Sequence, residues 1–138
     1  MPIANYSTDV PAVRTIGQIA GMLVTHGASN VTQHIADGQV IGIEFGIDTE
    51  FGWRPYRLPV RIEGVHLALN RDPAVSPRQR TEAHAARVAW RIAHDWLRIN
   101  LALIDAGMAS LPEVMFPYTL VNGQQTAFEL YAKKELEK

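Results

Sequence analysis

Two apolar stripes run along the stretch from Arg80 to Met108 and mark it as the main element of the chain. The stretch has no proline, has no glycine before Gly107, and is rich in Ala, Leu, Ile and Arg, which predicts one long α-helix. The first stripe recurs at steps of three and four residues and consists of Ala86, Trp90, Ala93, Leu97, Leu101, Ile104 and Met108. The second stripe lies beside it and consists of Ala85, Ala89, Ile92, Trp96, Ile99 and Leu103. At about 100° per residue they cover roughly 200° of the helix, so we expect cover on two sides, by a sheet and by another helix or subunit.

The remaining arc of this helix is basic. Its members are spaced by four and three residues and are Arg80, His84, Arg87, Arg91, His94 and Arg98. Cations at this spacing repel one another and do not stabilise a helix, whereas a phosphate backbone would neutralise them. The alternative interpretation is a solvated face, or a face paired with acidic groups such as Glu44, Asp48 or Glu50.

Residues 31–60 alternate between apolar and polar positions, which predicts strands over 31–35, 40–47 and 53–60. Asp37-Gly38 between the first two is a strong signal for a two-residue hairpin turn. In the second strand the predicted core positions are Ile41, Ile43, Phe45 and Ile47, and the other face carries Gly42 and Gly46 around Glu44.

Helices complete the predicted fold. We expect one from Thr15, as its N-cap, to His26, a short one over 61–70, and a last one capped by Thr126. Residues 1–13 read as an extended arm because Pro2 and Pro11 interrupt a helix, and residues 71–79 read as a polar, mobile loop. The order predicts a single α+β domain over 1–138: an antiparallel three-stranded meander sheet packed on one long α-helix, with short N- and C-terminal helices.

A second basic cluster falls on the predicted hairpin of the second and third strands. Trp53 lies there between two arginines, Arg54 and Arg57. An aromatic platform beside positive charge is how proteins bind single-stranded nucleic acid without reading its sequence.

Composition and charge narrow the classes of function. The net charge is −1, but residues 51–98 hold nine Arg against four acidic residues, and this polarity indicates an anionic partner. The chain has no cysteine, its histidines lack ligand spacing, and it contains no phosphate-binding glycine loop or nucleophile motif, so we predict no metal, no cofactor and no enzymatic activity. Without a signal peptide or an apolar run of about 18 residues, we expect a cytoplasmic protein that does not enter a membrane.

Several segments resemble a family of small proteins encoded by bacteriophages and prophages. They are the opening MPIANYST, the strand IGIEFGI with YRLPV, and above all AWRIAHDWLRINLALIDAGMASLPEVMFPY. The family has no assigned activity. The resemblance implies only that the protein is encoded by a phage or prophage and acts in the cytoplasm of a bacterial host. Arg91, Asp95 and Tyr118 fit the family pattern without an explanation from packing.

Two functions come first from the sequence, and a purely structural or assembly role is also open. The first is a phage accessory protein that binds nucleic acid, single-stranded rather than duplex, through Arg54, Arg57, Arg80, Arg87, Arg91, Arg98 and Trp53. The second is an oligomeric module that captures a host protein or an anionic nucleotide signal to evade host defence. In both cases we expect a homo-oligomer, with Trp96, Ile99 and Leu103 at the interface.

Overall fold

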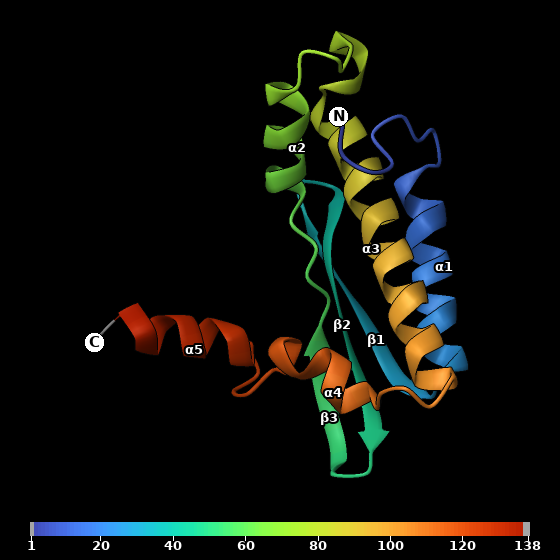
Figure 1. The fold of residues 1–138 in the computed structure, drawn as a ribbon, viewed down its shortest axis with the longest axis vertical. Helices are drawn as coiled ribbons and strands as arrows, with labels where there is room; N and C mark the ends of the chain where they lie inside the picture. Colours follow the sequence, from blue (N-terminus) through green and yellow to red (C-terminus); the bar gives the residue numbers. More distant parts are fainter. Residues whose placement is uncertain (1, 137–138) are drawn as a thin grey trace.

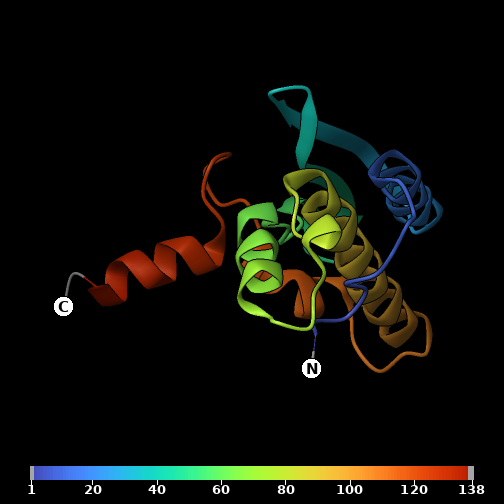
Figure 2. The same ribbon diagram turned by 90° about the horizontal axis from the view of Figure 1, so that it is seen from above.

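The fold is α+β, as the sequence predicted, with a three-stranded sheet on one side of a long helix (Figure 1). The computed structural model describes residues 2–136. Helices α1, α2 and α3 and the sheet form the body of the molecule, and α5 extends away from it (Figures 1 and 2). The elements are α1 (Ala12–Thr25), β1 (Ala28–Ala36), β2 (Gln39–Thr49), β3 (Gly52–Arg57), α2 (Ile62–Arg71), η1 (Pro77–Gln79), α3 (Glu82–Asp105), α4 (Leu111–Met115), η2 (Phe116–Tyr118) and α5 (Ala127–Leu136).

The sheet is an antiparallel meander in the order β1-β2-β3. Asp37 and Gly38 both have positive φ angles, of 52° and 74°, the conformation that a two-residue hairpin requires and that Asp-Gly tolerates. The predicted hairpin is therefore confirmed, although all three strands differ from the predicted bounds by up to three residues. The third strand ends at Arg57, and Leu58 beyond it is still buried.

One predicted core position of the sheet is wrong. Ile41 is 45% exposed, while Ile43, Phe45 and Ile47 are buried. The register moves from His34–Gly42 to Ile35–Val40, so Ile41 is an extra residue with no partner on β1. Such a β-bulge reverses the alternation of faces, which turns Ile41 toward solvent.

The main hydrophobic core lies between the inner face of the sheet, α1 and the first apolar stripe of α3. Ile16, Ile19 and Leu23 from α1 meet Ile43 and the neighbouring core residues of β2. From α3 the core receives Trp90, Ala93, Leu97 and Leu101, all predicted from the stripe. Trp90 is fully buried, and its indole nitrogen donates to the backbone oxygen of Val40 at 3.2 Å.

The second apolar stripe of α3 is covered only along its first half. Ala85 and Val88 pack with Leu69 of α2 and Val75 of the following loop, and Ile3 and Tyr6 of the N-terminal arm complete this cluster. Along the second half Trp96 and Leu103 are only partly buried and Ile99 is 52% exposed. The predicted mobility of residues 71–79 stays a prediction, although this segment carries buried Val75.

Helix α1 starts earlier than the sequence indicated. It begins at Ala12 after Pro11, whose φ of −59° suits a helix start, and Thr15 is buried inside the helix instead of capping it. The extended arm is correspondingly shorter than 1–13. Asn5 forms a turn in the arm with a φ of 63°, a conformation that asparagine adopts more readily than most residues.

A histidine–aspartate contact joins the C-terminal ends of α1 and α3. His26 Nε2 lies 3.0 Å from an oxygen of Asp105, and His26 Nδ1 lies 2.8 Å from the backbone oxygen of Met22. The hydrogen bond to Asp105, with a smaller contribution from Met22, raises the pKa of His26 above its ordinary value. The contact therefore stabilises the fold below about pH 6.5, the pKa of an unfolded histidine, and its contribution is lost as the pH rises through the folded-state pKa.

Asp105→Asn is expected to lower the melting temperature at pH 5.5 by about 1–3 °C, because an exposed pair contributes about 0.5 kcal/mol. At pH 8.5 the variant and the wild type should melt together. Thermal unfolding at both pH values measures the difference, and Asp48→Asn, an exposed carboxylate outside this contact, is the control. An equal loss at both pH values would show that Asp105 acts by packing instead of charge.

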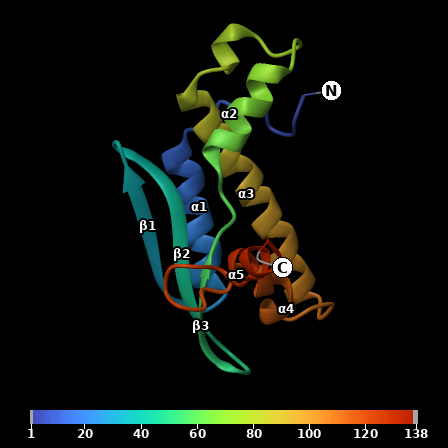
Figure 3. The ribbon, with the colours of Figure 1, turned by 90° about the vertical axis from the view of Figure 1, so that its left-hand side faces the viewer.

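The segment that follows α3 packs on the inner face of β3 and then leads away from the sheet. Ser110 and Glu113 form a reciprocal capping box at the start of α4, and Leu120 pairs with the backbone of Pro55 on β3. Beyond Leu120 the chain turns and enters α5, which points away from the body (Figures 1 and 2). Figure 3 looks at α5 from its C-terminal end. Among residues 2–136, no helix combines the length and the apolar character needed to cross a bilayer.

Candidate polyanion-binding face

The predicted six-membered basic ridge is shorter in the structure. Helix α3 begins at Glu82, so Arg80 precedes it and donates to the backbone oxygens of Val75 and Asp72 at 3.0 and 2.9 Å. His84 is buried, where its Nε2 contacts the backbone oxygen of Tyr6. The predicted helix start and the surface position of His84 are therefore wrong, because the N-terminal arm covers the first turn of α3.

Helix α1 supplies a basic residue that the sequence did not single out. The two helices run in parallel and side by side (Figures 1 and 3), and Arg91 of α3 donates to Gln18 of α1 at 2.8 Å. One turn earlier in each helix stand Arg87 and Arg14, and two turns after Arg91 stands Arg98. Arg87, Arg91 and Arg98 thus lie on one side of α3, next to α1, and Arg14 is exposed on α1; we call these four arginines the basic face.

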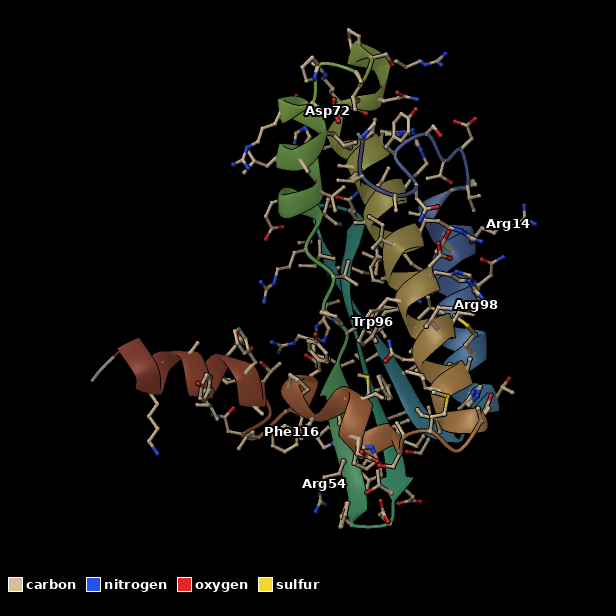
Figure 4. The ribbon with its side chains drawn as sticks, in the orientation of Figure 1. Arg14, Arg54, Asp72, Trp96, Arg98 and Phe116 are labelled. Atoms are coloured by element: carbon tan, nitrogen blue, oxygen red, sulfur yellow. The ribbon has the colours of Figure 1, made fainter. Side chains whose placement is uncertain are left out.

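Among the described residues, these four guanidinium groups have no direct ionic partner. None lies within 4.0 Å of a carboxylate oxygen in the part of the chain that the structure describes. Arg14 and Arg98 are exposed, and Figure 4 shows both on the α1 side of α3, with Trp96 on the other side. Arg91 and Arg87 are half-buried, and Arg87 donates to Nδ1 of His84 at 3.3 Å. The basic face therefore carries four positive charges that no carboxylate of the described residues contacts directly.

Asp95 is an acidic group beside the basic face, close enough for the charge of Arg91 to act on it, and it holds the N-terminal arm. It accepts a hydrogen bond from Asn5 at 3.0 Å and lies 3.0 Å from Nδ1 of His94. Burial alone would raise its pKa, but the hydrogen bonds from Asn5 and His94, with the charges of His94 and Arg91, bring the pKa below the ordinary value. Asp95 therefore stays ionised at neutral pH and anchors the N-terminal arm through Asn5.

The basic hairpin does not join the basic face. Trp53 and Arg57 lie on the outer face of the sheet, whereas α1 and α3 pack on the inner face, and Arg54 faces inward beside Phe116 and Pro112. This separation follows from the alternation of side chains along β3. The sequence placed the two arginines of the hairpin in one site, and the structure does not bring them together.

Arg57 is neutralised by acidic neighbours. Its guanidinium lies 2.9 Å from Glu44 and 3.4 Å from Glu129, and it also donates to the backbone oxygen of Gln124. His34 shares the Glu44 carboxylate at 3.2 Å. The outer face around Arg57 therefore offers little free positive charge to a phosphate.

Trp53 explains the bare glycine face of β2. A side-chain carbon added at Gly46 would lie 2.1 Å from the Trp53 ring, so the ring lies directly over this glycine. Its indole nitrogen donates to the hydroxyl of Ser29 at 3.0 Å, and the residue remains 46% exposed. Trp53 keeps a free ring surface, but on the side of the sheet opposite the basic face.

Tyr118 packs on the half-covered stripe of α3. Its ring meets that of Trp96 edge to face, with centroids 5.5 Å apart and planes at 88°. Aromatic pairs in this geometry stabilise a fold beyond their buried area. The contact gives Tyr118 a packing role, and it leaves Ile99 of the predicted interface exposed.

Comparison of the chain with protein-family models, with curated proteins and with solved structures finds no match. Within residues 2–134 no group of three His, Asp or Glu side chains is arranged to hold a metal ion. The basic face is the candidate binding site of the described chain.

Proposed function

We propose that this protein is a phage-type accessory protein that binds nucleic acid through the basic face. The observation that carries the proposal is the set of four arginines on α1 and α3 that make no contact with a carboxylate of the described residues. Holding like charges together on a folded surface costs free energy that an anionic ligand offsets. Arginine is suited to this role because its planar guanidinium donates two parallel hydrogen bonds to a phosphate.

The shape of the basic face favours an extended ligand. From Arg87 to Arg98 the face follows α3 for about 16 Å at 1.5 Å per residue, roughly five nucleotides of one strand at 3.4 Å each. Arg14 and Arg98, near its two ends, are both exposed. A polyanion contacts the whole row, whereas a single nucleotide would satisfy only part of it.

The basic face would contact phosphate groups and would not recognise particular bases. The expected preference for single strands depended on stacking by Trp53, which does not share this face. Duplex DNA carries the higher charge density, so phosphate contacts alone favour the duplex or show no preference. With this ligand the protein would act in the cytoplasm of a bacterial host.

A titration of labelled oligonucleotides, followed by fluorescence anisotropy, tests the proposal. With four phosphate contacts per protomer, raising the salt from 50 to 200 mM should weaken duplex binding about 100-fold. Affinity should also increase with strand length. Absence of binding at 50 mM salt would contradict the proposal, and saturation by one mononucleotide per protomer would instead favour a small anionic ligand.

A further inference from the structure

Helix α5 lacks the packing that a helix of its length needs. It spans Ala127–Leu136, and none of its described side chains is buried. Its first turn alone is held, by the reciprocal hydrogen bonds of Thr126 and Glu129 at 3.0 and 3.1 Å and by the contact of Arg57 with Glu129. Isolated helices shorter than about 12–15 residues are marginal in water. The helix therefore requires a contact that residues 2–134 of its own chain do not supply.

The exposed side chains of α5 are suited to such a contact. Phe128 is 50% exposed and Tyr131 is 62% exposed. Exposed aromatic groups that lie close together on one short element are typical of protein interfaces. The helix stands clear of the body in Figures 1 and 2, so a partner has free access to it.

An apolar groove of about 750 Å³ lies between α2, α3 and the base of α5. Its walls include Val60, Val65, Ile92, Trp96, Tyr118 and Phe128. A second hollow shares Ile92 and Trp96 and adds Ile99, which is 52% exposed. The groove lies over the middle of the second apolar stripe of α3, at Ala89, Ile92 and Trp96.

We infer that two copies of this chain exchange α5, the helix of each copy entering the groove of the other. Phe128 belongs to the wall of its own groove, and from there α5 leads away from that groove (Figure 1). In a two-fold symmetric dimer, α5 of the partner enters this groove, so that the same contact covers the exposed side of α5 and the apolar groove in both copies. This inference stands independently of nucleic-acid binding.

Area and charge both fit a second copy. The two α5 helices of a dimer carry two exposed aromatic side chains each. Together with the groove walls that they cover, they bury on the order of 1,000 Å², the threshold for a specific interface. The exposed Lys133 and Lys134 of α5 are opposite in charge to Asp95, which lines the second hollow. Both sides of the contact therefore come from the same chain.

Light scattering after size exclusion tests the exchange on the full chain. Wild type should be a dimer, and Tyr131→Asp and Ile99→Asp should each weaken it about 30-fold or more, as expected for a central interface residue. Val24→Asp is the control, because Val24 is 61% exposed on α1, away from the groove. A monomeric wild type, or a Tyr131→Asp protein that dimerises like the wild type, would overturn the inference.

Crosslinking gives a second readout that does not rely on weakening the dimer. The chain has no cysteine, so Tyr131→Cys protein mixed with Val65→Cys protein can join these two positions with a bismaleimide only between chains. We expect the mixed crosslink at dimer mass. A double variant that instead crosslinks efficiently within a monomer would show that α5 folds onto its own groove and would overturn the exchange.

Discussion

Arg14→Glu/Arg98→Glu is expected to weaken nucleic-acid binding by at least about 100-fold at low salt. Both side chains are exposed, so the reversal should leave the fold intact. The change removes two phosphate contacts and places two carboxylates beside the remaining arginines, which reduces the charge of the basic face from +4 to zero. Each lost contact should also lower the salt dependence of log K by about one unit. Anisotropy titrations at several salt concentrations measure both quantities.

Arg71→Glu/Arg78→Glu is the matched control for this experiment. It makes the same change in net charge on exposed residues of α2 and η1, across α3 from α1 (Figure 1). If binding depends on the basic face, the control should lose much less affinity than the test variant. Equal losses would mean that net charge alone drives binding, and the basic face would then have no special role.

Trp90→Ala is expected to lower the free energy of unfolding by about 3–5 kcal/mol. Trp90 is fully buried where α1, the sheet and α3 meet, so its removal leaves a large cavity in the main core. It also leaves the backbone oxygen of Val40 without the indole donor, and an unsatisfied buried acceptor is unfavourable. A loss of this size is a large fraction of the stability of an ordinary domain, so much of the protein should be unfolded at 37 °C.

Urea denaturation followed by circular dichroism measures this change. Val13→Ala is the control, because Val13 on α1 is 80% exposed and its truncation should change stability by less than about 0.5 kcal/mol. Trp90→Phe should be intermediate, since it refills part of the cavity but does not restore the donor. A Trp90→Ala protein as stable as the wild type would mean that Trp90 is not central to the core.

The apolar stripes of α3 show what the periodicity of the sequence can predict and where the prediction fails. Trp90, Leu97 and Leu101 are buried as predicted, because a repeat of three and four residues fixes one side of a helix whatever packs on it. The same periodicity placed His84 with Arg91, although one is buried and the other half-buried. Periodicity gives the angle around the helix, but the arm that covers its first turn comes from residues almost 80 positions away.

The candidate site was predictable only in part for the same reason. Arg87, Arg91 and Arg98 were found from their spacing on one helix. Arg14 joins them only because α1 packs beside α3 in register, and Arg57 leaves the set because Glu44 and Glu129 lie against it. Neither contact has a local signal in the sequence.

Local conformational preferences and the periods of strands and helices were enough to predict the class of fold, the hairpin at Asp37-Gly38 and the apolar sides of the long helix. Three features needed the folded chain: which charges are neutralised, the bulge at Ile41, and the partial cover of the second half of the second stripe on α3. Those outcomes depend on which distant segments meet. The local pattern of apolar and polar residues does not indicate these long-range contacts, because they depend on how the whole chain packs.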